Sequence, residues 1–310
     1  MVGPAGVVTN YTYPGIAGPT AITTGPDGSS WFTNEFNNTI GRITTAGVVT
    51  IYADPSISDP DAITAGSDGA LWFTNFGHSS IGRITTAGVV TNYTDPSIKS
   101  PGSIIIGSDG ALWFTNWSNN SIGRISTSGV IINFDGGGTK NPVGIAAQGG
   151  SLWFTNYGAS TIGEITTSGV ITDNLFPGIS DPLEMATGSD GALWFANEGN
   201  GGSIGRVTTA GQVSIFALTD AVSPTGLAAG PDGALWFTDY GGDSIGRITT
   251  AGVVTKYTGP GISRPYAITT GPDGALWFTN FGNSSIGRIT TTGVITNYAS
   301  PKIDGPEAIA

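Results

Sequence analysis

The chain contains no cysteine, and only one of its 310 residues is histidine. Without cysteine it can form neither a disulfide nor a thiolate metal site, and it has no thiol nucleophile. No apolar run approaches the roughly 20 residues that a membrane-spanning helix requires. The first residues, MVGPAGVVTN, lack the basic and apolar regions of a signal peptide. We therefore expect a soluble chain with no membrane partner, and a location outside the cell would require a leader not included in this sequence.

Charged residues are scarce, at 11%, and most are acidic, which gives a formal net charge of -11. Nucleic acids are bound mainly through Lys and Arg side chains that neutralise phosphates. An acidic chain repels such a polyanion at long range. The composition therefore predicts no nucleic-acid partner.

What the chain has in place of these features is a repeat. The tetrapeptide Trp-Phe-Thr-Asn, or a close variant, occurs seven times, with successive tryptophans 41, 41, 40, 41, 42 and 41 residues apart. These are Trp31, Trp72, Trp113, Trp153, Trp194, Trp236 and Trp277. A period this constant is typical of one supersecondary unit stacked repeatedly, because a single unit cannot bury its apolar face alone.

Each repeat predicts four short strands and no helix. Between Pro265 and Tyr298, four β-prone stretches are separated by GPDG, FGNS and TTG, which are turn sequences. Six repeats have an Asp-Gly pair that suits a tight hairpin between the first and second strands. The fourth repeat has Gln148-Gly149-Gly150, from which we expect a similar turn.

The second strand is apolar on both faces, as in Leu71, Trp72 and Phe73, so its sheet must be covered on both sides. The fourth strand is more polar, which suits an outer edge. We predict a single domain over residues 1–310, an all-β, seven-bladed β-propeller of four-stranded antiparallel blades. A linear solenoid is the alternative, but four antiparallel strands per repeat favour blades.

The repeated sequence G-P/S-D-G-A-L-W-F-T-N, S-I-G-R-I-T, G-V-V-T-x-Y and P-x-A-I-T resembles that of the virginiamycin B lyase (streptogramin lyase) family of seven-bladed propellers. The resemblance covers every repeat. It implies a Mg²⁺-assisted elimination that opens the ester-linked ring of a cyclic peptide antibiotic, with His bases and Glu on one face of the propeller.

In that family, His occurs directly after the Pro of P-x-A-I-T, and the position after W-F-T is usually Glu. Here the positions after Pro hold Thr20, Asp61, Gly102, Val143, Leu183, Thr225, Tyr266 and Glu307. The positions after W-F-T, or its variant W-F-A, hold Asn34, Asn75, Asn116, Asn156, Asn197, Asp239 and Asn280. Glu35 and Glu198 lie one residue further on. Because no His occupies these positions and a general base needs a pKa near neutrality, we predict no catalytic residue.

Strand counting places Tyr266 opposite Asn280, at the end of the hairpin away from the Asp-Gly turn. We expect every blade to present such a pair at the mouth of the central channel, where a small or extended ligand would bind. The predicted ligand-binding residues are Tyr266 and the seven residues Asn34, Asn75, Asn116, Asn156, Asn197, Asp239 and Asn280. We predict no metal site and no cofactor, and Mg²⁺ enters only if the chain is a lyase.

Aromatic residues follow several of these Asn or Asp positions. They could stack on sugars or peptide rings, but packing between adjacent loops is the interpretation we prefer. The residues are Phe76, Trp117, Tyr157, Tyr240 and Phe281.

The only histidine, His78, lies between the second and third strands of its repeat, and we interpret it as a solvated loop residue. Six Arg residues follow Ile-Gly in the third strand, where we expect them to contact a carboxylate or carbonyls of a neighbouring turn. Glu164 breaks this series. One carboxylate per Asp-Gly turn is too few for Ca²⁺.

Two functional hypotheses follow. The first is a non-catalytic propeller that acts as a binding or scaffold module, because near-identical blades do not bring different residues to one point as a catalytic centre requires. The alternative is a Mg²⁺-dependent C–O lyase acting on streptogramin B-type antibiotics, with its base moved to a carboxylate such as Asp61, Asp239 or Glu307.

The ends of the chain carry more strands than seven blades need. A surplus strand is predicted over residues 6–12, and a half-repeat extends over 293–310 with a further first strand at 308–310. Only one fourth strand can complete blade seven. We expect residues 6–12 to do so, as in the family, which leaves 293–310 to pack elsewhere or to self-associate through an open strand edge. The alternative is local closure by residues 293–298.

Overall fold

The computed structural model describes residues 13–174, 176–219, 223–300 and 303–310. In these residues, 28 strands form seven four-stranded antiparallel sheets. This confirms the all-β, seven-bladed β-propeller fold class that the repeat predicts. One single-turn 3₁₀ helix, η1 (Tyr157–Ala159), is also present, and no helix in the described residues is long and apolar enough to cross a membrane.

The chain divides into two compact units, of which residues 13–175 form one. It contains blades one to four, each with its strands in chain order. These are β1 (Pro19–Thr24), β2 (Ser30–Asn34), β3 (Thr39–Ile43) and β4 (Val49–Ala53); β5 (Pro60–Ala65), β6 (Ala70–Asn75), β7 (Ser80–Thr85) and β8 (Val90–Thr94); β9 (Pro101–Ile106), β10 (Leu112–Asn116), β11 (Ser121–Ile125) and β12 (Ile131–Asp135); and β13 (Pro142–Gln148), β14 (Ser151–Asn156), β15 (Thr161–Thr166) and β16 (Ile171–Asn174).

Residues 176–310 belong to the second unit and contain blades five to seven. Their strands are β17 (Pro182–Thr187), β18 (Leu193–Asn197), β19 (Ser203–Val207) and β20 (Val213–Ala217); β21 (Pro224–Ala229), β22 (Leu235–Asp239), β23 (Ser244–Ile248) and β24 (Val254–Thr258); and β25 (Pro265–Thr270), β26 (Leu276–Asn280), β27 (Ser285–Ile289) and β28 (Ile295–Ala299).

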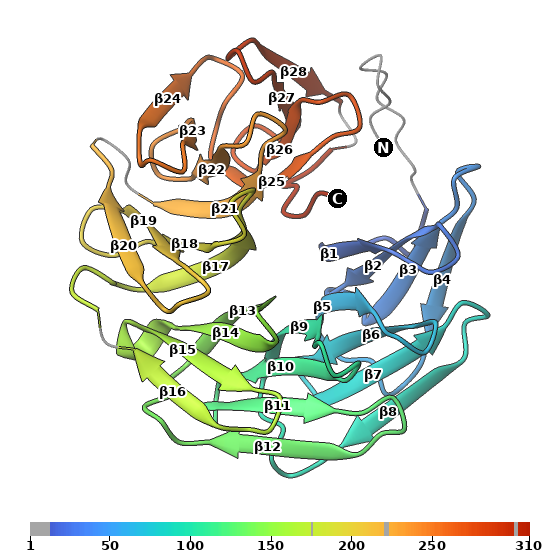
Figure 1. The fold of residues 1–310 in the computed structure, drawn as a ribbon. Coiled ribbons are helices and arrows are strands. Elements are labelled where there is room, and N and C mark those ends of the chain that lie inside the picture. Colours follow the sequence, from blue (N-terminus) through green and yellow to red (C-terminus); the bar gives the residue numbers. More distant parts are fainter. Residues whose placement is uncertain (1–12, 175, 220–222, 301–302) are drawn as a thin grey trace. The chain divides into compact units, whose positions relative to one another are not determined.

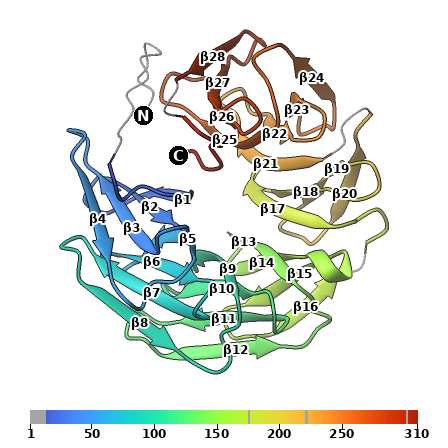
Figure 2. The same ribbon diagram turned by 180° about the vertical axis from the view of Figure 1, so that it is seen from behind.

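Within each blade the four strands lie side by side in chain order, as Figure 1 shows for β5 to β8 and Figure 2 shows from behind. The blade is therefore a meander with two distinct ends. The Asp-Gly turn is at one end, which we call the turn end. The Asn or Asp of each Trp-Phe-Thr-Asn is at the other, which we call the Asn end.

The second strand of each blade fills the core. In blade two, Trp72 and Phe73 have no exposed surface. The Phe73 ring lies against Gly82 of the third strand, and a Cβ at Gly82 would overlap the ring. The glycine of the Ile-Gly-Arg sequence therefore leaves the space that the phenylalanine fills, as close packing of the interior requires.

The turn end is fastened by one Asp that binds both a Trp and an Arg. In blade two, Trp72 Nε1 donates to Asp68 Oδ1 (3.1 Å) and Arg83 Nε donates to Asp68 Oδ2 (2.6 Å). Partial burial acts to raise the pKa of Asp68, but the hydrogen bonds from Trp72 and Arg83 hold that pKa below its usual value. The predicted contact between the arginine and a turn carboxylate is confirmed in all six blades that have the arginine.

Blade four lacks both charged partners. Gln148 pairs with Ser151 across a two-residue turn, whose glycines have φ of 61° and 89°. In blade one the corresponding pair is Thr24 with Ser30, so the expectation of a similar turn in blade four is wrong. The short turn carries no carboxylate for an arginine to bind, which gives a physical reason for Glu164 at that position.

Neighbouring blades within each unit interlock through the fourth strand. The Trp72 ring stacks on Tyr93, with centroids 5.3 Å apart. Tyr93 in turn lies against Gly129 of blade three, which has φ of +90° and where a Cβ would overlap the ring. Tyr257 makes the same contact with Gly293 in the second unit. Only glycine meets both the backbone and the space requirement at this turn.

Blade seven is completed by its own fourth strand, because β28 pairs with β27. The expectation that residues 6–12 form the outer edge of this blade is therefore wrong, since the local strand follows β27 after a short turn and takes that place. Residues 6–12 themselves lie outside the described residues. The first strand predicted at 308–310 is not formed, and nearby Gly305 N–H donates to Ser284 Oγ (3.2 Å).

Candidate functional site

Each first strand contains a β-bulge at the Asn end, where the resemblance places catalytic residues. In blade seven Pro265 pairs with Asn280, and the register shifts before Ile268. The prediction that Tyr266 lies directly opposite Asn280 is therefore wrong by one residue, because the first strand has one residue more than its partner. Bulges of this kind often re-aim a side chain beside a functional site.

The side chains at the bulge differ from blade to blade. Asp61 and Tyr266 are exposed, and the others are half-buried. In the unit of residues 13–175 the positions after proline are Thr20, Asp61, Gly102 and Val143, and in the second unit they are Leu183, Thr225 and Tyr266. This end therefore has variable chemistry on a constant backbone, with no imidazole at any of these seven positions.

The threonine of Trp-Phe-Thr-Asn holds the bulge in place. Thr238 Oγ1 accepts the N–H of Gly226 (2.8 Å) in its own blade and donates to the carbonyl oxygen of Tyr266 (2.6 Å) in the next. Blade one repeats both bonds. The hydroxyl of one blade thus positions the backbone of the next at its variable residue. Blade five has Ala196 in place of this threonine.

The seven Asn or Asp side chains predicted to bind a ligand are enclosed at the Asn end. Each has an exposed fraction of 0%: Asn34, Asn75, Asn116, Asn156, Asn197, Asp239 and Asn280. In blade three, Asn116 Oδ1 accepts the N–H of Lys99 (3.2 Å), and its Nδ2 donates to Ser121 Oγ (3.2 Å) and Asn133 Oδ1 (3.1 Å). These contacts fasten the incoming connection and indicate a structural role, which the sequence reasoning missed. Direct contact with a ligand stays a prediction.

Blade six makes a related contact with charged groups. Asp239 accepts hydrogen bonds from Ser223 N–H (3.1 Å) and Ser244 Oγ (2.9 Å), and Lys256 Nζ lies 3.5 Å from its Oδ2. Lys256 has the register position that Asn133 has in blade three, opposite the glycine of the third strand. A carboxylate and an ammonium therefore replace two amides.

Aromatic rings contribute exposed surface at the Asn end of blades six and seven. Tyr266, which is 44% exposed, meets Tyr240 edge to face with ring centroids 6.2 Å apart. Tyr240 also lies 6.4 Å from the ring of Phe281. Tyr240 and Phe281 thus pack between loops, as the preferred interpretation expects, whereas Tyr266 leaves much of its ring open.

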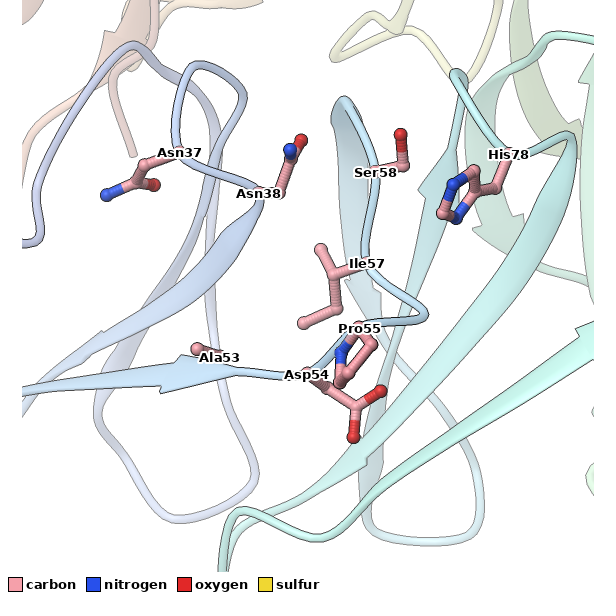
Figure 3. Close-up of a pocket in the computed structure, with 8 residues that line it drawn as sticks. All are labelled: Asn37, Asn38, Ala53, Asp54, Pro55, Ile57, Ser58 and His78. Carbon is pink, nitrogen blue, oxygen red and sulfur yellow. The ribbon is translucent and has the colours of Figure 1, made fainter.

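His78 borders a depression of about 450 Å³ between the loops of blades one and two, which Figure 3 shows. It is lined by Asn37, Asn38, Ala53, Asp54, Pro55, Ile57, Ser58 and His78. Figure 3 shows the Asp54 carboxylate pointing away from the His78 ring, so the two do not form an acid–base pair. Hydrogen bonds from the hydroxyl and N–H of Ser56 lower the pKa of Asp54.

His78 also takes a position that asparagine has in other blades. Its Nδ1 lies 3.4 Å from the carbonyl oxygen of Ser56, on the connection that enters blade two. In blade three, Asn119 Nδ2 donates to the carbonyl oxygen of Ser97 on the corresponding connection (2.6 Å). The imidazole is exposed, as the sequence predicts, but its position repeats a structural contact.

The three glutamates Glu35, Glu198 and Glu307 differ in their surroundings. Glu198 accepts a hydrogen bond from Ser223 Oγ (2.9 Å), whereas Glu35 and Glu307 are half-buried. Across the described parts of the chain, no three His, Asp or Glu side chains come together as a metal-binding group.

These features define a class of protein: a repeat β-propeller with strongly fastened blades and a bulged, variable Asn end. The chain belongs to the virginiamycin B lyase family, whose sequence model matches residues 1–179 and 177–310. A comparison with curated protein sequences finds no match.

Among solved structures, the chain is similar to a streptogramin B lyase, with 34% identity over 80% of this chain and 86% of that chain and a TM-score of 0.70. It is also similar to virginiamycin B lyase from Staphylococcus aureus, with 34% identity over 94% of this chain and 88% of that one and a TM-score of 0.65. A catalytically inactive histidine-to-alanine variant of the S. aureus enzyme, with quinupristin, matches at 33% identity over 97% and 91% of the two chains, with a TM-score of 0.67.

Proposed function

We propose that this chain is a non-catalytic propeller that acts as a binding or scaffold module. The observation that carries the proposal is the position of its only histidine. His78 lies on a loop of blade two, where it repeats the structural contact of Asn119, and no bulge position holds a histidine. The S. aureus relative is described as catalytically inactive when one histidine becomes alanine. A chain without an imidazole at the bulges lacks the group best suited to abstract a proton near neutral pH.

The ligand surface that we propose is the Asn end of the blades. Each unit has such a surface of its own: Tyr266 offers an open aromatic ring in the unit of residues 176–310, and Asp61 offers an exposed carboxylate in the unit of residues 13–175. The enclosed Asn and Asp side chains would support such a surface by fixing the loops around it. Residues that differ between blades on a fixed backbone suit recognition of a small or extended ligand.

The alternative is a Mg²⁺-dependent lyase, which family membership and 34% identity to streptogramin B lyase favour. Its base would have to be a carboxylate with a strongly raised pKa. Asp239 has no exposed surface and is held by Ser223, Ser244 and Lys256, whereas Asp61 is exposed to water. Mg²⁺ prefers sites with carboxylate oxygens, and the described residues gather no group of three such ligands. The described residues therefore do not fit a Mg²⁺ site.

The test is incubation of the purified chain with Mg²⁺ and quinupristin, followed by mass spectrometry of the peptide ring. Virginiamycin B lyase from S. aureus serves as the positive control. We expect the ring to stay closed with this chain while the control opens it. Ring opening that Asp61→Asn abolishes, and that Val89→Ala at the turn end of the same blade leaves unchanged, would establish the lyase alternative.

A further inference from the structure

Most of the described Lys and Arg side chains of this chain form an ion pair with an Asp, but two lysines do not. Six arginines pair with turn aspartates, and Lys256 pairs with Asp239. Among the described residues, the Lys and Arg side chains with no carboxylate oxygen within 4.0 Å are Lys99, Lys140 and Arg264. Lys99 and Lys140 are the two that belong to the unit of residues 13–175, and both are exposed.

Both lysines lie beside the aromatic loops of blades three and four. The carbonyl oxygen of Lys99 accepts the N–H of the residue after Trp117 (3.4 Å), and that of Lys140 accepts the N–H of the residue after Tyr157 (3.1 Å). The backbone therefore fixes each lysine next to one aromatic residue. A flexible four-carbon stem then lets the ammonium group reach a ligand above the ring.

The two aromatic rings form one platform. The ring centroids of Trp117 and Tyr157 are 5.8 Å apart, with planes at 41°, and Asn141 Nδ2 ties the loops together by donating to the carbonyl oxygen of Trp117 (3.2 Å). Trp117 is half-buried, whereas the other seven of the eight tryptophans are at most 6% exposed. This platform thus has the one tryptophan that a ligand can reach.

We propose that Trp117, Tyr157, Lys99 and Lys140 bind an acidic oligosaccharide whose sugar rings carry carboxylates. Aromatic faces pack on the apolar surface of a ring, and each ammonium attracts one carboxylate. A nucleic-acid strand presents a phosphate on every nucleotide and needs more cations than two. This binding site is independent of whether the chain turns over a substrate.

The experiment measures the Kd of a short oligogalacturonate by calorimetry, with its neutral methyl ester as the matched ligand. Trp117 fluorescence gives a second signal, because the other tryptophans are buried. We expect binding of the acid that weakens as salt rises. Lys99→Gln and Lys140→Gln should each raise the Kd of the acid about three- to fivefold, because each removes one solvent-exposed charge pair with the ligand. The control Arg264→Gln changes the net charge equally and should leave the Kd unchanged.

Three results would overturn the proposal. The methyl ester could bind as tightly as the acid, Arg264→Gln could weaken binding as much as Lys99→Gln, or oligo(dT) could bind more tightly than the oligogalacturonate. Each variant changes an exposed side chain, and an unchanged melting temperature verifies that it is folded.

Discussion

The ion pair between Asp239 and Lys256 in blade six can be replaced by the pair of residues that other blades have at the same two positions. Where blade six has this pair, blades two, three and seven have two asparagines, whose amides are 3.1 to 3.3 Å apart. We predict that Asp239→Asn and Lys256→Asn each destabilise the protein, and that the double variant is close to the original.

The magnitudes follow from burial. Removing one partner of a buried ion pair costs about 3–5 kcal/mol. The Lys256 side chain is 31% exposed, and Asp239 keeps its hydrogen bonds from Ser223 and Ser244. We therefore expect about 1–3 kcal/mol for Lys256→Asn, which leaves an enclosed carboxylate without its counter-charge. Asp239→Asn should cost about 1 kcal/mol, because the ammonium can still reach water. The double variant should lie within about 0.5 kcal/mol of the original, since Asn–Asn fits the other blades.

Thermal unfolding by calorimetry measures these differences for the original chain, the two single variants and the double variant. The reverse exchange in blade seven, Asn280→Asp with Asn297→Lys, is the matched control and should be tolerated as a pair. A double variant as unstable as the sum of the two single variants would refute the reasoning, because the two sites would then act independently.

Three further outcomes are expected. Thr238→Val should lower the free energy of unfolding, measured by urea denaturation, by about 1–3 kcal/mol, because the N–H of Gly226 and the carbonyl of Tyr266 each lose a hydroxyl partner. A loss no larger than that caused by the same substitution at an exposed threonine would contradict this. The fold lowers the pKa of turn aspartates such as Asp68 from the ordinary value of 3.8, so these groups stabilise the folded state fully above pH 3.8. Unfolding measured during an acid titration should show this stability being lost as the pH falls through the lowered pKa, and a free energy of unfolding that rises on acidification in this range would contradict the prediction. Deleting 303–310 should leave the melting temperature nearly unchanged, whereas deleting 293–310 removes β28 and should lower it clearly; equal effects would argue against local closure of blade seven.

The fold could be predicted because its determinants lie close together in the sequence and recur in phase. Trp72, Asp68 and Arg83 meet within one hairpin and the next strand, so the repeat itself encodes their contacts. Blade four shows that these contacts depend on nearby residues. Its short turn contains no aspartate, so an arginine in the third strand would have no carboxylate to bind, and the chain has Glu164 at that position instead.

The Asn end could not be predicted as well, because its contacts join segments that lie further apart. Asn116 follows the strand alternation, but whether its amide meets water or protein depends on the connection that carries Lys99, 17 residues earlier. The register of Tyr266 was missed because a bulge adds one residue that strand counting does not reveal. A hydroxyl acting across blades, as Thr238 does, leaves no local pattern in the sequence either.

The most direct test of the central claim is a single-turnover measurement with the chain in excess over quinupristin and with Mg²⁺ present. Excess protein detects even a very slow lyase, because each substrate molecule can then be bound at once. We predict that the fraction of opened rings matches a sample without protein at every time point. A time course that opens the ring faster than that blank, and that scales with the amount of chain, would contradict a non-catalytic propeller.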